Sequence, residues 1–236
     1  MHKSLFLVCA LAAPALHAAD IDRLQNLNQT QFLRFSEDMG AALSYKAMLP
    51  AEPLGITGFD VGAEVTATDL QNPELLHAVT GDDDLDTVVI PKLHAHKGLP
   101  FDLDVGLFYA SVPGSNITLT GAELRYAFID GGLVMPALAV RGTWSRLGGV
   151  DQLDMETKGL ELTVSKGFAM ITPYAGVGRV WVDSEPNDVP NLESESFSLG
   201  KYYVGANLAL GLVSVAVEAD RTGDAQTIGA KLALRF

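Results

Sequence analysis

Long stretches of this sequence alternate apolar and polar residues with a period of two. In the segment FDLDVGLFYA, residues 101–110, the odd positions are apolar and the even positions begin Asp, Asp, Gly. The segments 201–210 and 213–220 alternate in the same way. Such alternation predicts β-strands with one apolar and one polar face. Strands of about 10–12 residues suit a tilted membrane crossing, whereas soluble strands average about 5–6.

The alternation predicts ten strands joined by connections of two kinds. The strands are expected at 56–68, 88–97, 101–112, 117–128, 133–144, 155–166, 170–183, 197–210, 212–220 and 225–236. Tight turns alternate along the chain with connections that are longer on average, as in outer-membrane barrels. We therefore expect an all-β fold: a transmembrane antiparallel up-and-down β-barrel of about ten strands, or alternatively twelve. Both termini are expected on the periplasmic side, with the long loops outside.

Composition is consistent with this fold and excludes several others. Hydrophobic residues make up 48% of the chain. After the N-terminal region, however, no apolar run approaches the roughly 20 residues that a transmembrane helix needs. The formal net charge of −13 argues against binding to nucleic acid, whose phosphates attract Lys and Arg. A soluble β-sandwich also alternates and is the main rival fold.

The N-terminus predicts export. The sequence MHKSLFLVCALAAPALHAAD has a basic start, a short apolar run and small residues before Asp20, which is typical of a signal peptide. We expect a signal peptide at 1–19, a helical plug or periplasmic segment at 20–53, and the barrel at 54–236. Cys9 lies in the apolar run, so the mature chain is expected to have no cysteine.

The C-terminus carries a second export feature. The last strand alternates and stops on the aromatic Phe236. It resembles the terminal signature by which the barrel assembly machinery of the outer membrane recognises its substrates. The resemblance implies that machinery, outer-membrane lipid and lipopolysaccharide as partners, and the bacterial outer membrane of a Gram-negative cell as location.

The alternation also assigns a lipid face and a lumen face. A Lys or Arg facing hydrocarbon costs about 2–4 kcal/mol at the midplane, so the charged faces are expected inside. The residues expected to face lipid include Leu103, Val105, Leu107, Tyr202, Val204, Val215 and Leu232. Those expected to line the lumen are Asp60, Glu64, Lys92, His94, His96, Asp102, Asp104, Glu123, Arg125, Arg141, Glu161, Arg179, Lys201, Glu218, Lys231 and Arg235. Such a mixed set is equally compatible with a closed salt-bridge network.

Catalytic and metal sites are not expected. His94 and His96 share one strand face, but two ligands do not make a site and the sequence assigns no third. The His, Ser and Asn pattern of outer-membrane phospholipase is absent around them. The ten strands resemble omptin proteases, yet Asp82-Asp83-Asp84 matches only the acidic pair of that family, and His77 lies in no matching motif. We expect neither an enzyme nor a cofactor.

The two longest connections are acidic. The loop 69–87 has six acids and no Lys or Arg, and 184–196 has four acids. Divalent cations bridging to lipopolysaccharide are one interpretation, since oxygen ligands suit Ca²⁺ and Mg²⁺. A solvated surface is the plainer one.

Residues 20–53 do not alternate. Phe32, Phe35, Met39 and Leu43 fall at helical spacing and predict an amphipathic helix that plugs the lumen. The stretch RFSEDMGAALSYKAMLPAEPLG resembles the N-terminal hatch of the long-chain fatty-acid transporter family, although the Asn of that family's Asn-Pro-Ala turn is missing. The resemblance implies a plugged barrel that moves small hydrophobic molecules. A helix lying beneath the barrel, or an extra strand, are the alternatives.

Two functions remain open. The first is a narrow or plugged channel or transporter for small molecules of unknown identity, which the hatch resemblance implies are hydrophobic. The second is a closed barrel that serves the envelope structurally or through its outer loops. Because about eight strands give a lumen just filled by side chains and 16–18 leave an aqueous channel, ten strands argue against an open porin.

Overall fold

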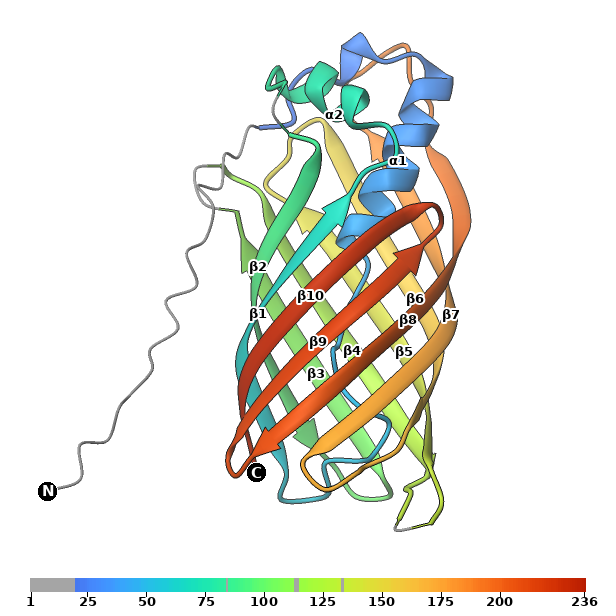
Figure 1. The fold of residues 1–236 in the computed structure, drawn as a ribbon. Helices are drawn as coiled ribbons and strands as arrows, with labels where there is room; N and C mark the ends of the chain where they lie inside the picture. The colour runs from blue at the N-terminus through green and yellow to red at the C-terminus, as the bar shows by residue number, and fades with distance from the viewer. Residues whose placement is uncertain (1–19, 84, 113–114, 133) are drawn as a thin grey trace, which may run out of the picture.

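The computed structural model describes residues 20–83, 85–112, 115–132 and 134–236. The predicted signal peptide, with Cys9, lies outside these residues. The described residues form ten strands in one closed barrel (Figure 1), which confirms the predicted fold class. The strands are β1 (Phe59–Asp69), β2 (Thr87–Gly98), β3 (Leu103–Ser111), β4 (Thr118–Ile129), β5 (Ala137–Gly148), β6 (Leu153–Ser165), β7 (Ile171–Pro186), β8 (Glu195–Leu210), β9 (Val213–Thr222) and β10 (Ala225–Arg235).

Each strand pairs antiparallel with its neighbours in sequence, and β1 pairs with β10 to close the wall. The last residue takes part in this closure. The backbone of Phe236 accepts from the Phe59 N–H at 2.6 Å and donates to the Phe59 carbonyl at 3.0 Å. The two rings lie 5.5 Å apart between centroids. A closed sheet has no free edge, which removes the unpaired backbone groups that hydrocarbon cannot satisfy.

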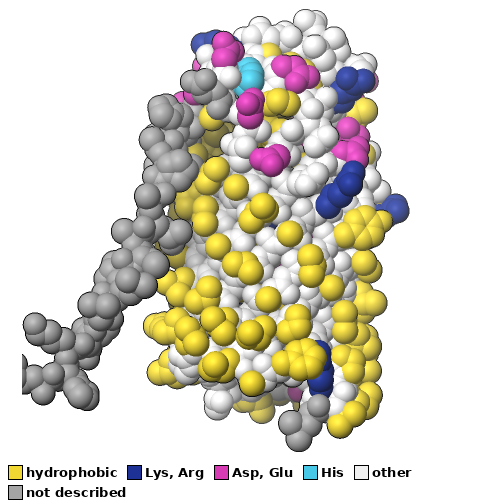
Figure 2. Space-filling view, in the orientation of Figure 1, with side chains coloured by type: hydrophobic (Ala, Val, Ile, Leu, Met, Phe, Trp, Pro, Cys, Tyr) yellow, Lys and Arg dark blue, Asp and Glu magenta, His cyan; other side chains and the backbone are white. Residues whose placement is uncertain are grey.

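The outer surface of the wall is apolar over most of its height. Leu107, Tyr202, Val204 and Leu232 are 54–60% exposed, and their strand neighbours point inward. Figure 2 shows apolar side chains over the lower and middle wall, with acidic side chains gathered near the upper end. None of the helices in the described part of the chain is long and apolar enough to cross a membrane. The wall surface is that of a membrane-spanning barrel.

The two ends of the barrel differ. One end, here called the loop end, carries the connections 70–86, 112–117, 149–152, 187–194 and 223–224. The turn end carries 99–102, 130–136, 166–170 and 211–212. The connection 70–86 contains helix α2 (Pro73–Thr80), which begins with Pro73 at its first position and ends before Gly81, whose φ is 74°. This helix was missed, although an initial Pro and a terminal Gly are its ordinary sequence markers.

The N-terminal residues begin at the loop end, not at the turn end. A 3-10 turn, η1 (Leu24–Asn26), precedes helix α1 (Gln29–Leu43), and both lie at the same end as α2 (Figure 1). Asn28 and Gln31 cap α1 reciprocally, each side chain accepting from the other's backbone N–H. From α1 the chain passes through the lumen to β1 (Figure 1). Asp20, the first described residue, thus lies at the loop end, whereas Phe236 lies at the turn end. The prediction that both ends of the mature chain lie on one side of the barrel is therefore wrong.

Two residues predicted to line the lumen do not. Asp102 lies in the exposed β2–β3 turn with a φ of 57°, so it precedes the strand that was expected to include it. Arg179 lies on the exposed face of β7 together with Trp181, while Val180 is buried. The even residues of β7 point inward, so Arg179 belongs to the outer face, where it donates to Ser198 Oγ at 3.3 Å.

Candidate functional site

A segment of the chain occupies the interior of the barrel. Residues 44–51, here called the lumen segment, follow α1 and are all buried. They form no strand, so their backbone polar groups have no sheet partners to satisfy them. The site is therefore defined by how the wall binds this segment.

The lumen segment begins with a charged cap on α1. The Lys46 ammonium donates to the Ala41 carbonyl at 2.8 Å and to the Ser44 carbonyl at 3.3 Å. A cation at this position interacts favourably with the negative end of the helix dipole. Lys46 also lies 3.9 Å from Asp220 on β9, which links the helix end to the wall.

Basic side chains of the wall donate to the backbone carbonyls of the lumen segment. Lys201 on β8 donates to the Tyr45 carbonyl at 2.6 Å, and Arg141 on β5 donates to the Leu49 carbonyl at 3.3 Å. Arg125 on β4 donates to the Pro50 carbonyl. In this way side chains of the wall, and not a neighbouring strand, satisfy the backbone carbonyls of the lumen segment.

The same basic groups are paired with buried carboxylates. Lys201 contacts Glu161 at 2.7 Å, and Arg141 lies 3.2 Å from both Glu161 and Glu123. Arg125 pairs with Asp104 at 2.6 Å, and Asp104 accepts from the Leu54 N–H at 3.0 Å. Lys201, Glu161, Arg141 and Glu123 thus form one connected chain of charges, and Arg125 with Asp104 forms a separate pair. Each of the three bases Lys201, Arg141 and Arg125 joins the wall to the segment.

Small residues make room for the segment. Ala51 packs against three alanines of β4 and β5. A Cβ at Gly229 on β10 would overlap the end of the Met48 side chain. A Cβ at Gly40 would lie 2.7 Å from a methyl group of Val182 on β7, so α1 approaches the wall closely. The wall therefore packs closely around α1 and this segment at Gly40, Met48 and Ala51.

The structure places the remaining predicted residues as follows. The stripe Phe32, Phe35, Met39 and Leu43 is buried, each residue at most 5% exposed. Arg235 is half-buried at the turn end of β10. The other predicted lumen residues are buried on the inner face: Asp60, Glu64, Lys92, His94, His96, Asp104, Glu123, Arg125, Arg141, Glu161, Lys201, Glu218 and Lys231.

Sequence reasoning missed the contributions of Tyr45 and Lys46. The Tyr45 hydroxyl lies 3.2 Å from His96 Nε2, and Lys46 joins α1 to Asp220. A lysine within the otherwise apolar stretch between α1 and Pro50 was the available signal, because such a charge must find a buried partner.

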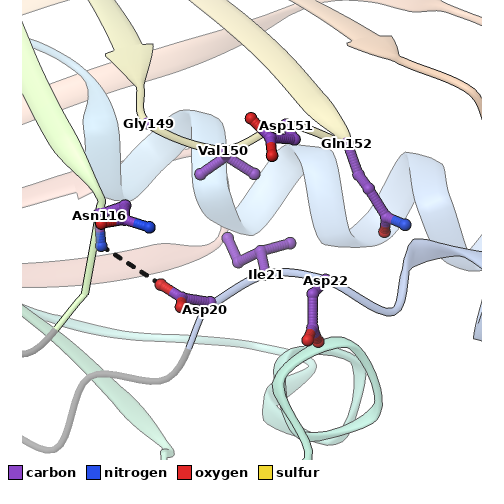
Figure 3. Close-up of a pocket in the computed structure, with 8 residues that line it drawn as sticks. All are labelled: Asp20, Ile21, Asp22, Asn116, Gly149, Val150, Asp151 and Gln152. Carbon is purple, nitrogen blue, oxygen red and sulfur yellow. Dashed lines mark hydrogen bonds between the residues drawn. The ribbon is translucent and has the colours of Figure 1, made fainter.

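The N-terminal residues are held by the loops. In Figure 3, Asp20, Ile21 and Asp22 lie beside the connections of β3–β4 and β5–β6. Asp20 accepts from the Asn116 N–H at 3.3 Å, and Ile21 is buried. A pocket of about 300 Å³ lies here, and Asp151 adds a third carboxylate to its lining.

A smaller cavity of about 90 Å³ lies between α1 and the β9–β10 connection. Glu37, Asp38 and Asp224 line it. Burial, followed by the like charges of Asp38 and Asp224, raises the pKa of Glu37 above its ordinary value. The loop end is therefore acidic at its surface and in its crevices.

No protein-family model and no curated protein matches this chain. Among solved structures, Ail, the attachment invasion locus protein of Yersinia pestis, aligns at 13% identity over 76% of this chain and 97% of Ail, with a TM-score of 0.30. OprG from Pseudomonas aeruginosa aligns at 10% identity over 81% of this chain and 99% of OprG, with a TM-score of 0.35. Neisserial surface protein A aligns at 8% identity over 75% of this chain and 95% of its own, with a TM-score of 0.31. Similarity at these levels says nothing about function.

The closed wall, apolar outside and charged inside, defines a transmembrane β-barrel. The described residues of this protein form a ten-stranded barrel of that class. The N-terminal resemblance to the fatty-acid transporter family stays a hypothesis.

Proposed function

We propose that this protein is a non-enzymatic outer-membrane barrel that does not conduct solutes, and that it acts through its acidic loop end. The observation that carries the proposal is the lumen segment, which is buried throughout and bound by side chains of several strands. A ten-stranded lumen has little room beyond its own side chains. With a backbone segment added, no continuous aqueous path is expected.

The strength of the attachment argues for permanent occupancy. Besides the three carbonyl contacts, the Ala51 N–H donates to Ser165 Oγ at 2.9 Å, and Ser145 Oγ donates to the Leu43 carbonyl at 2.8 Å. A hydrogen bond contributes about 0.5–1.5 kcal/mol net, and more when one partner is charged. Five such bonds and the burial of α1 favour the state in which the segment occupies the lumen.

A plugged transporter for small molecules is the second candidate. It is favoured by the absence of strand pairing for the lumen segment among the described residues. Because only side chains bind the segment to the wall, it could leave without breaking the sheet. A partner that competes for these side chains would be needed to release it.

Planar-bilayer recording separates the two. The intact protein is expected to be electrically silent. A variant that lacks residues 20–50 is expected to conduct, because α1 and most of the lumen segment no longer occupy the interior. A control in which residues 187–191 at the loop end are replaced by glycine and serine keeps the lumen segment and should stay silent. Steady conductance of the intact protein, with correct folding shown by its heat-dependent gel mobility, would overturn the proposal.

A further inference from the structure

Three metal-ligating side chains meet on the inner wall beside the lumen segment. Asp60 lies on β1, and His94 and His96 lie on β2, where Asp60 is the direct cross-strand partner of His96. One donor atom from each lies within 4.8 Å of the others. His94 Nε2 and Asp60 Oδ1 lie 2.9 Å apart and form a hydrogen bond, so these two side chains already approach each other closely.

The three side chains are buried and incompletely satisfied. Each is at most 4% exposed. Among the described residues, Asp60 Oδ2, His94 Nδ1 and His96 Nδ1 have no hydrogen-bond partner. A buried polar atom without a partner costs about 1–3 kcal/mol. Each of the three side chains therefore has one polar atom without a hydrogen bond, besides the atoms through which His94 bonds Asp60 and His96 contacts Tyr45.

We propose that Asp60, His94 and His96 form a binding site for one divalent transition-metal ion of the zinc, cobalt or nickel type. Two imidazoles with one carboxylate suit these ions, whereas Ca²⁺ and Mg²⁺ prefer oxygen ligands alone. The inference is independent of whether the barrel conducts.

The neighbouring charges are compatible with a cation. Lys231 lies 3.2 Å from Asp60 Oδ1, which leaves Oδ2 of that carboxylate available. Two further carboxylates approach the imidazoles: Glu64 lies 3.8 Å from His94 and Glu123 lies 3.4 Å from His96. Each carboxylate also has a basic partner, Lys92 for Glu64, Lys231 for Asp60 and Arg141 for Glu123, so an entering cation meets neutral pairs and not an excess of positive charge.

The site also contacts the lumen segment. The Tyr45 hydroxyl lies 3.2 Å from His96 Nε2, so it can orient that ring or supply an additional oxygen ligand. Partners of this kind around a metal typically change its affinity by about 10–100-fold. A bound ion would thus join β1, β2 and the lumen segment in one cross-link.

The test uses Co²⁺, whose visible absorption reports nitrogen coordination. The full mature chain, purified without a polyhistidine tag, is refolded in detergent with Co²⁺, because the site is closed once the barrel has formed. We expect one Co²⁺ per barrel. His94→Ala and His96→Ala should each weaken binding by about 100-fold, and Tyr45→Phe by about tenfold. His77→Ala is the matched control, because His77 lies in α2 at the loop end.

Folded protein is selected by its gel mobility before metal analysis. Asp60→Asn and His96→Gln serve as conservative variants if an alanine variant does not fold. Absence of stoichiometric Co²⁺ in the folded protein would overturn the proposal. So would Co²⁺ binding that persists in His94→Ala and His96→Ala, since the ion would then be bound by other residues.

Discussion

The pair of Arg125 and Asp104 tests whether the lumen charges hold the segment in place. Both side chains are completely buried. Arg125 donates to Asp104 Oδ2 through Nε at 3.1 Å and through Nη2 at 2.6 Å, and its Nη1 donates to the Pro50 carbonyl. Asp104 in turn accepts from the Leu54 N–H. Arg125→Met removes all three donors while preserving most of the volume.

The size of the stability loss depends on the Asp104 carboxylate that Arg125→Met leaves without its partner. Removing one partner of a buried ion pair costs about 3–5 kcal/mol, because the remaining charge is uncompensated. The side chain in Asp104→Asn can still accept a hydrogen bond from the Leu54 N–H. The double variant of Arg125→Met and Asp104→Asn therefore keeps that contact and has no unpaired buried charge. We expect Arg125→Met to lower the free energy of unfolding by about 3–5 kcal/mol. The double variant should be about 2 kcal/mol less destabilised than Arg125→Met alone, so the two single costs are not additive.

Urea unfolding in liposomes, followed by tryptophan fluorescence, measures these differences. Arg179→Met is the matched control, because Arg179 is exposed and contacts only Ser198 among the hydrogen bonds of the described residues. Its cost should stay below about 1 kcal/mol. Additive costs in the Arg125 and Asp104 cycle, or a cost for Arg125→Met no larger than that of Arg179→Met, would refute the role assigned to the pair.

Three further predictions follow from packing, charge and chain path. Gly229→Val should lower the free energy of unfolding by about 1–3 kcal/mol through overlap with Met48, and Met48→Ala should restore most of it, as urea unfolding would show. Glu37→Gln should raise the melting temperature at neutral pH. The raised pKa means that ionisation of Glu37 disfavours the folded state, so stability falls as pH rises through that pKa, and the difference should disappear below about pH 4. An epitope placed directly before Asp20 should be labelled on intact cells, because Asp20 lies at the loop end.

Each of these has its own contrary outcome. Equal destabilisation by Gly229→Val with and without Met48→Ala would mean that strand geometry, not the side-chain overlap, is responsible. A melting temperature of Glu37→Gln that differs from wild type equally at pH 4 and pH 7 would exclude ionisation as the cause. An epitope before Asp20 that is labelled only after outer-membrane permeabilisation, while one at residue 190 is labelled on intact cells, would contradict the chain path.

The wall of the barrel could be predicted from the sequence because its constraint is local. In a strand, successive side chains point to opposite faces, and a charge facing hydrocarbon is costly. Arg125, Arg141 and Glu161 therefore had to point inward, and Leu107 and Val204 outward, whatever the rest of the chain does. This reasoning fails at Arg179 on β7, because the charged Arg179 and the apolar Trp181 lie two residues apart and so point to the same face. The sequence of β7 alone therefore does not say which of its faces points into the lumen.

The interior was decided by the tertiary structure, because it depends on contacts between residues far apart in the sequence. The helical stripe of α1 required burial, but its spacing contains no information about the direction in which the chain crosses the lumen. That direction follows from two sets of contacts. A loop binds Asp20 at one end of the barrel, and basic side chains of the wall bind the backbone carbonyls of Tyr45 and Pro50 inside it. Asp60 likewise became the third neighbour of the two histidines only through the register of β1 against β2. Cross-strand register is a property of the closed sheet, and neither strand specifies it alone.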